Sequence, residues 1–122
     1  MAASDGRPEL IFKIEHGQAW REAEQAGVYR GAAIDHRDGF IHFSAASQVR
    51  GTLEKYFAGC SGLVLVAVDA GQCGGALKWE VSRDGERFPH LYASLPMAAV
   101  VGVGAIGAEG TLPNATAWGL DR

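Results

Sequence analysis

Hydrophobic and polar residues alternate along several short stretches of the chain, and this period of two predicts β-strands. Leu10–Ile14 places three apolar side chains on one side, as expected of a strand with one buried face. Leu63–Val68 is a continuous apolar run, which is typical of a central strand covered on both faces. Further strands are predicted at Gly39–Ser44, Ala76–Val81, Phe88–Tyr92 and Val100–Ile106.

In two segments the spacing of the apolar residues is that of a helix instead of a strand. In Gly17–Ala26 small and apolar side chains recur on one side, and Gly27 is suited to end the helix. A second helix is predicted after Ser44, whose hydroxyl is placed to cap it. Arg30–Gly39 is rich in charge and glycine and is predicted to be a loop, while Pro96–Ala99 makes a single turn.

Strands and helices mixed in this way predict a single α+β domain at residues 9–106. A length of 122 residues, with 48% hydrophobic and 20% charged residues, describes one globular domain with one core. Residues 1–8 are predicted to be a disordered lead and residues 107–122 a loose C-terminal tail. Trp118 in this tail either docks on the domain or contacts a partner. That partner could be a second copy of the chain in a homodimer.

Charge and hydropathy narrow the classes of partner. The net charge is -3 and no Lys/Arg cluster is present, which argues against a broad nucleic-acid-binding surface but leaves a local cationic pocket open. The first residues lack the apolar segment of a secretory signal, and no apolar run is long enough to span a membrane. We therefore expect a cytoplasmic protein with no membrane partner.

Phe40, His42 and Ser44 share one side of the Gly39–Ser44 strand, because side chains alternate across a strand. Aromatic and aliphatic neighbours predict that this strand is buried, and a buried imidazole needs a hydrogen-bond partner or a ligand. His42 is interpreted either as a core histidine or as a binding or orienting group. Ser44 is expected to cap a helix rather than act as a nucleophile, because the G-x-S-x-G elbow is absent.

Two later strands carry a second group of polar residues. Lys78 and Glu80 share one side of a strand, as do His90 and Tyr92, and Arg83 lies at the turn between them. Glu80 is either a surface partner of Lys78 or Arg83, or a catalytic carboxylate at the mouth of a cleft. His90 and Tyr92 either pack in an aromatic hairpin or line the same cleft. No histidine pair has the spacing of a metal site, so we predict no metal.

Six segments stand in an order and spacing that identify a family. They are Gly39-Phe-Ile-His-Phe-Ser44, Gln48-Val49, Tyr56-Phe57, Leu63-Val-Leu-Val-Ala-Val-Asp69, Trp79-Glu80 and Phe88-Pro-His-Leu-Tyr92. Together they resemble the small bacterial family called domain of unknown function 952 (DUF952). The resemblance runs from about Leu10 to Ile106, and the two histidine motifs make it specific.

The resemblance implies a fold similar to that of the ADP-ribosyltransferases and the RNA 2'-phosphotransferases. That fold has two small, mainly antiparallel sheets with two short helices and a cleft that holds NAD. NAD is therefore the candidate cofactor, and a nucleotide the candidate small-molecule partner. Glu80 corresponds to the late acidic residue, whose carboxylate stabilises the oxocarbenium character that develops when the bond from ribose to nicotinamide breaks. His42 is the second candidate catalytic residue.

The same comparison makes Ser44, Arg83, His90 and Tyr92 candidate ligand-binding residues. Arg83 would hold a phosphate bidentately, and Tyr92 or Phe43 would stack on nicotinamide. The first hypothesis is thus an NAD- or nucleotide-binding enzyme of ADP-ribosyltransferase-like type. The second is a non-catalytic module that binds a small ligand or a protein through the same cleft. The third is structural, with both histidines serving only the core.

Overall fold

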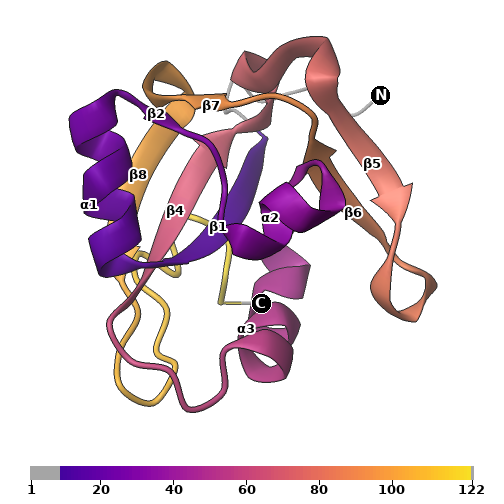
Figure 1. The fold of residues 1–122 in the computed structure, drawn as a ribbon. Helices are drawn as coiled ribbons and strands as arrows, with labels where there is room; N and C mark the ends of the chain where they lie inside the picture. The colour runs from indigo at the N-terminus through magenta and orange to yellow at the C-terminus, as the bar shows by residue number, and fades with distance from the viewer. Residues whose placement is uncertain (1–8, 122) are drawn as a thin grey trace.

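The computed structural model describes residues 9–121, so the lead predicted at residues 1–8 lies outside the described residues. Figure 1 shows short helices and strands gathered around a central sheet. The strands are β1 (Leu10–His16), β2 (Val28–Tyr29), β3 (Ile41–His42), β4 (Leu63–Asp69), β5 (Leu77–Val81), β6 (Arg87–Leu91), β7 (Leu95–Pro96) and β8 (Val100–Ala105). The helices are α1 (Gly17–Ala26), α2 (Ala33–Asp38) and α3 (Val49–Tyr56), and short 3₁₀ helices lie at Ala46–Gln48, Ala70–Ala76, Arg83–Gly85 and Met97–Ala99.

The central sheet has the order β1-β4-β8, and both pairings are antiparallel. β4 lies in the middle with Leu65 and Val66 fully buried, which confirms the prediction of a doubly covered strand. α1 lies beside β4 and β8 in Figure 1 and buries Trp20 in the same core cluster as Val66. This helix ends at Gly27 with φ 82°, a left-handed conformation that favours glycine, as predicted.

The opposite face of the central sheet is covered by α3 and the C-terminal segment. Leu112 and Leu120 from this segment are buried in the cluster that contains Phe12 of β1 and Val49 of α3. Trp118 docks beside β8, where a Cβ added at Gly102 would lie only 2.9 Å from its ring. Because Gly102 has no side chain, the C-terminal segment can approach β8 (Val100–Ala105) closely.

A second antiparallel sheet has the order β3-β6-β5, and β2 pairs with β7 in a short separate ladder. Just beyond β3, Ser44 forms an isolated bridge with Phe12, which joins this sheet to β1. The protein is thus an α+β protein with small antiparallel sheets, as predicted. It differs from the expected two sheets and two helices by the β2–β7 ladder and by α2.

The prediction of a loop at Arg30–Gly39 was wrong for its second half, which forms α2. The helix begins because the Asp35 carboxylate accepts a hydrogen bond from the backbone N–H of Ala32, one of the groups that a helix start leaves unpaired. It ends at Gly39, which has φ 89°. A six-residue helix carries too little periodicity to be recognised from its sequence.

The capping prediction for Ser44 was also wrong. The 3₁₀ helix that leads into α3 begins at Ala46, and its N-cap residue is Ala45. The hydroxyl of Ser44 instead lies 2.9 Å from the hydroxyl of Thr52 on α3. Ser44 therefore fastens the strand to the side of the helix rather than to its beginning. Within residues 9–121, no helix has the length and apolar character needed to cross a membrane.

Candidate functional site

The β3-β6-β5 sheet brings four of the predicted site residues to one face. His42 lies directly opposite His90, and the centroids of their imidazole rings are 5.5 Å apart. Glu80 on β5 lies opposite Phe88, two residues before His90, and its side chain shares that face. Tyr92 continues the face just past the end of β6. The sequence separates these residues by up to fifty positions, and strand pairing unites them.

Phe40 is the centre of this face and was not among the predicted site residues. Its ring stacks on His90 with the centroids 4.1 Å apart, and it lies 4.5 Å from the His42 ring and 5.2 Å from the Tyr92 ring. The alternation of the strand had already placed Phe40 on the same side as His42, which is the signal that could have identified it. We call Phe40, His42, Glu80, His90 and Tyr92 the imidazole face.

Glu80 is held in place by two neighbours on this face. Its Oε1 atom lies 2.8 Å from Nδ1 of His90 and also accepts a hydrogen bond of 2.8 Å from the Tyr92 hydroxyl. The hydrogen bond from His90, followed by that from Tyr92, holds the pKa of Glu80 below its usual value, and the pKa of Tyr92 is raised by the same contact. Glu80 is therefore ionised at neutral pH, and Nδ1 of His90 must carry the proton.

A different network surrounds His42. Nδ1 of His42 lies 2.6 Å from Oδ1 of Asp35, which also accepts from the His42 backbone N–H. Oδ2 of Asp35 accepts 2.8 Å hydrogen bonds from Nζ of Lys13 and from the backbone of Ala32. Every lone-pair direction of this carboxylate is thus occupied. Burial raises the pKa of Asp35, but the bonds from His42 and Lys13 outweigh it and leave the pKa at about 2.

The second nitrogen of the His42 ring is also bound. Nε2 lies 3.0 Å from Oδ2 of Asp38. The pKa of Asp38 is lowered, chiefly by the hydrogen bond from Arg37, and the charge of Arg37 and the nearby His42 lower it further, although burial acts in the opposite direction. The two ring nitrogens of His42 therefore face carboxylate oxygens of Asp35 and Asp38, at 2.6 and 3.0 Å respectively. Because both ring nitrogens face carboxylates of the protein itself, His42 is poorly placed to act as a base on a ligand.

The network of Lys13, Asp35, His42 and Asp38 was largely missed by the sequence analysis. Asp35 and Asp38 stood in the segment expected to be a loop, where acidic residues are ordinary. Spacing of three residues places them on one side of α2, but this could be seen only once the segment was known to be helical. Lys13 is almost completely buried, with 6% exposure, in a strand that looked purely structural.

Ser44 and Arg83 lie on a neighbouring part of the sheet, beside α3. The Arg83 guanidinium lies 4.8 Å from the centroid of Phe88 and 5.7 Å from that of Tyr56, and it donates a 3.3 Å hydrogen bond to Thr52. Thr52 also contacts Ser44, so these residues form a connected cluster. Only 14% of the Arg83 side chain is exposed, which leaves little of it available to a ligand.

A shallow, open pocket of about 350 Å³ lies where β3 begins and β6 ends. Two residues of the imidazole face, Phe40 and Tyr92, form part of its wall, so the pocket and the face are continuous. We call it the strand-end pocket. Its lining includes Arg30, His36, Phe40, Tyr92, Ala93 and Ser94.

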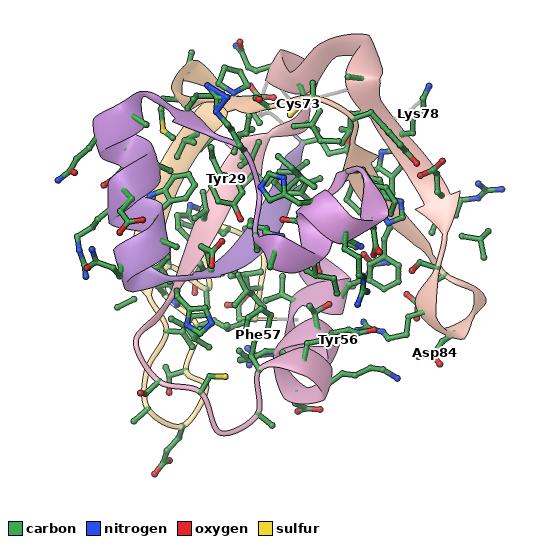
Figure 2. The ribbon with its side chains drawn as sticks, in the orientation of Figure 1. Tyr29, Tyr56, Phe57, Cys73, Lys78 and Asp84 are labelled. Atoms are coloured by element: carbon green, nitrogen blue, oxygen red, sulfur yellow. The ribbon has the colours of Figure 1, made fainter. Side chains whose placement is uncertain are left out.

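The remaining polar residue of the predicted group, Lys78, lies opposite His90 on the same side of the sheet as Glu80 but takes no part in the hydrogen bonds of Glu80. Lys78 is exposed on β5, and Figure 2 shows its side chain extending away from the body of the protein, with Asp84 at the tip of the β5–β6 hairpin. The Glu80 carboxylate makes its hydrogen bonds to His90 and Tyr92 rather than to Lys78. Across the described part of the chain, no three His, Cys, Asp or Glu residues are grouped so that they could hold a metal ion.

Comparison with known proteins assigns the family. The model of the family described as protein of unknown function (DUF952) matches residues 14–103, and the chain belongs to this family. The matched region contains all five residues of the imidazole face and also Asp35 and Asp38. Membership confirms the resemblance that the six sequence segments indicated.

The chain is also similar to solved structures of one bacterial protein, CC0527 from Caulobacter crescentus. Its crystal structure has 42% sequence identity and a TM-score of 0.81, and the match covers 91% of this chain and 99% of that one; a double mutant of CC0527 gives the same values. The solution NMR structure has 41% identity, a TM-score of 0.75, and coverage of 92% and 98%. No curated protein matches the chain.

Proposed function

We propose that this protein binds a nucleotide-like ligand such as NAD on the imidazole face, and that Glu80 is the catalytic carboxylate of a reaction at the ribose. One observation carries the proposal: Oε1 of Glu80 is held by His90 and Tyr92, while Oε2 makes no hydrogen bond to any of residues 9–121. The carboxylate is ionised, oriented and partly exposed. A carboxylate held in this way is suited to stabilise positive charge that develops on a ligand.

The chemistry would be cleavage of the bond between C1' of the ribose and the nicotinamide nitrogen. Nicotinamide leaves with the bonding electron pair, and the positive charge left on the ribose is stabilised by the Glu80 carboxylate. Water or an acceptor hydroxyl then adds to C1' and loses a proton. His90 is suited to take this proton at Nε2, because its Nδ1 proton is directed at Glu80.

His42 would act as a positioning residue in this proposal. Both of its nitrogens are bound to carboxylates, and its ring contacts Phe40, which stacks on His90. It therefore supports the geometry of His90 without touching the reacting atoms. Two points support an ADP-ribosyltransferase-like type of reaction. One is the resemblance stated above, and the other is that the Glu80 carboxylate is oriented but not fully hydrogen-bonded, whereas the carboxylate of Asp35 is.

The test is to incubate the protein with NAD and to measure nicotinamide release by chromatography. Glu80→Gln should lower the rate by roughly 100-fold or more, because it removes the charge but keeps the shape. Glu54→Gln, an exposed change on α3, is the matched control and should leave the rate unchanged. An unchanged rate for Glu80→Gln would remove its catalytic role.

A non-catalytic ligand-binding protein is the second candidate, favoured by the complete occupation of His42 and by the openness of the strand-end pocket. Thermal unfolding with NAD, ADP-ribose and mononucleotides separates the two. A ligand at 100 times its dissociation constant adds about 2.7 kcal/mol of stability. Binding without nicotinamide release would favour the second candidate, and the absence of any shift would overturn both nucleotide proposals.

A further inference from the structure

We propose that the strand-end pocket binds a phosphate group and that Arg30 is its cationic contact. This inference rests on the proposed function, because a nucleotide needs a site for its phosphates beside the imidazole face. It also replaces Arg83, which the sequence had suggested for that role. The pocket volume of about 350 Å³ lies at the lower end of the range of small-ligand sites, roughly 300–1,000 Å³.

Two cations near the imidazole face are already engaged, and a third, Lys78, is not among the residues that line the pocket. Lys13 is buried against Asp35, and the Arg83 guanidinium is packed on Phe88. Arg30, in contrast, is exposed at the rim of the pocket, and no ion pair joins it to another of residues 9–121. A guanidinium in this state can offer two parallel hydrogen bonds to a phosphate.

Further donors lie on the other side of the same pocket. Ala93 and Ser94 follow β6 in an exposed bend, and within residues 9–121 their backbone N–H groups have no backbone acceptor. Ser94 and His36, whose side chains carry a hydroxyl and an imidazole, are also among the residues that line the pocket. A phosphate presents three strong acceptor oxygens, whereas a carboxylate presents two. A pocket with several hydrogen-bond donors therefore suits a phosphate better than a carboxylate.

The Asp35 carboxylate in the pocket wall does not oppose an anion. It is 2% exposed, and its charge is matched by that of Lys13, while Asp38 is paired with Arg37. The charge left over at the pocket is therefore that of Arg30. Phe40 and Tyr92 connect the pocket to Glu80, so a ligand with its phosphate at Arg30 would extend its ribose toward the carboxylate.

The experiment is a titration of the full chain with inorganic pyrophosphate, followed by ¹⁵N–¹H correlation spectra. We expect saturable shifts of the backbone amides at Arg30, Ala93 and Ser94, and a loss of affinity of roughly tenfold or more in Arg30→Gln. Arg21→Gln, an exposed change on α1 outside the pocket, is the matched control. Acetate, titrated in parallel, should give weaker shifts.

Three results would overturn the phosphate site. These are equal affinity in Arg30→Gln and the unchanged protein, loss of affinity in Arg83→Gln instead, and acetate shifts as strong as those of pyrophosphate. Absence of saturable shifts would overturn it as well. Correct folding of each variant is checked by the dispersion of the same spectra, so a lost site is distinguished from a lost fold.

The same measurements separate this inference from the proposed function. Pyrophosphate binding that depends on Arg30, without nicotinamide release from NAD, would leave the phosphate site standing and remove the proposed reaction. Nicotinamide release that is unaffected by Arg30→Gln would overturn the phosphate site and leave the reaction standing.

Discussion

Two histidine–carboxylate pairs lie side by side on the β3-β6-β5 sheet, and they differ in how completely their hydrogen-bonding groups are used. In the pair of His42 and Asp35, both ring nitrogens and all four lone-pair directions of the carboxylate are occupied. In the pair of His90 and Glu80, one carboxylate oxygen and one ring nitrogen have no partner among residues 9–121. The first pair is suited to hold the structure together, and the second keeps atoms available for a ligand.

The difference follows from position in the fold. Asp35 is a residue of α2, and its carboxylate accepts hydrogen bonds from Lys13 on β1, from the backbone of His42 on β3 and from the backbone of Ala32. Glu80 lies on β5, the edge strand of its sheet, where only β6 supplies neighbours. A buried carboxylate needs full pairing because an unpaired charge in the interior is costly, whereas an exposed one is solvated by water.

The largest effect that would test this comparison is on stability. Asp35→Ala should lower the free energy of unfolding by about 3–5 kcal/mol, because it leaves the Lys13 ammonium buried without its partner. Urea denaturation measures the change, and Glu80→Ala is the control that should unfold at nearly the same urea concentration as the unchanged protein. Combining Asp35→Ala with Lys13→Met should recover part of the loss. Equal destabilisation by the two single changes would contradict the distinction.

Lowering the pH should reduce the stability of the protein through protonation of Asp35. The pKa of Asp35 is about 2 in the folded protein against 3.8 for the free side chain, so the unfolded chain binds the proton more readily. This pairing contributes about 2 kcal/mol above pH 4, and the contribution is lost as the pH falls toward 2. Urea unfolding between pH 5 and pH 2.5 should show a steeper decline in the unchanged protein than in Asp35→Asn. Parallel declines would mean that the carboxyl is not paired as described.

The protonation of the two imidazoles provides a more direct test without any substitution. Long-range ¹⁵N–¹H spectra near pH 7 should show a proton at Nδ1 of His42, because this nitrogen faces the ionised Asp35 carboxylate. His90 should show a proton at Nδ1 and a free lone pair at Nε2. A free lone pair at Nδ1 of His42, or a proton on Nε2 of His90 instead of Nδ1, would contradict the contacts assigned to the two pairs.

The smallest expected effect concerns the ionisation of Glu80. Tyr92→Phe removes the second of the two hydrogen bonds that lower its pKa, so that pKa should rise toward its ordinary value. His90→Phe should raise it further, because the bond from His90 has the larger influence. The carboxyl carbon resonance of Glu80, followed against pH, measures both changes. A smaller rise for His90→Phe than for Tyr92→Phe would show that the tyrosine is the main partner.

Much of the fold was predictable because its signals are local. The helix at Gly17–Ala26 with its terminal glycine, and the apolar strand at Leu63–Val68, follow from side-chain periodicity and from the conformational freedom of Gly27. α2 was not predictable, because it has only six residues and because the partners of Asp35, Lys13 and His42, lie outside the helix. The hydroxyl of Ser44 likewise found its partner on the side of a helix and not at the helix start.

The sequence by itself determined which residues of each strand share a face, because alternation is a property of the extended backbone. It thereby grouped Phe40 with His42, Lys78 with Glu80, and His90 with Tyr92. Only the tertiary structure decided which strands lie together and which polar atoms remain without a partner. Pairing depends on register across long separations in the chain, and the occupation of a hydrogen-bonding atom depends on everything packed around it. For this reason His42 and Glu80 were both candidate catalytic residues from the sequence, and only their surroundings separate their roles.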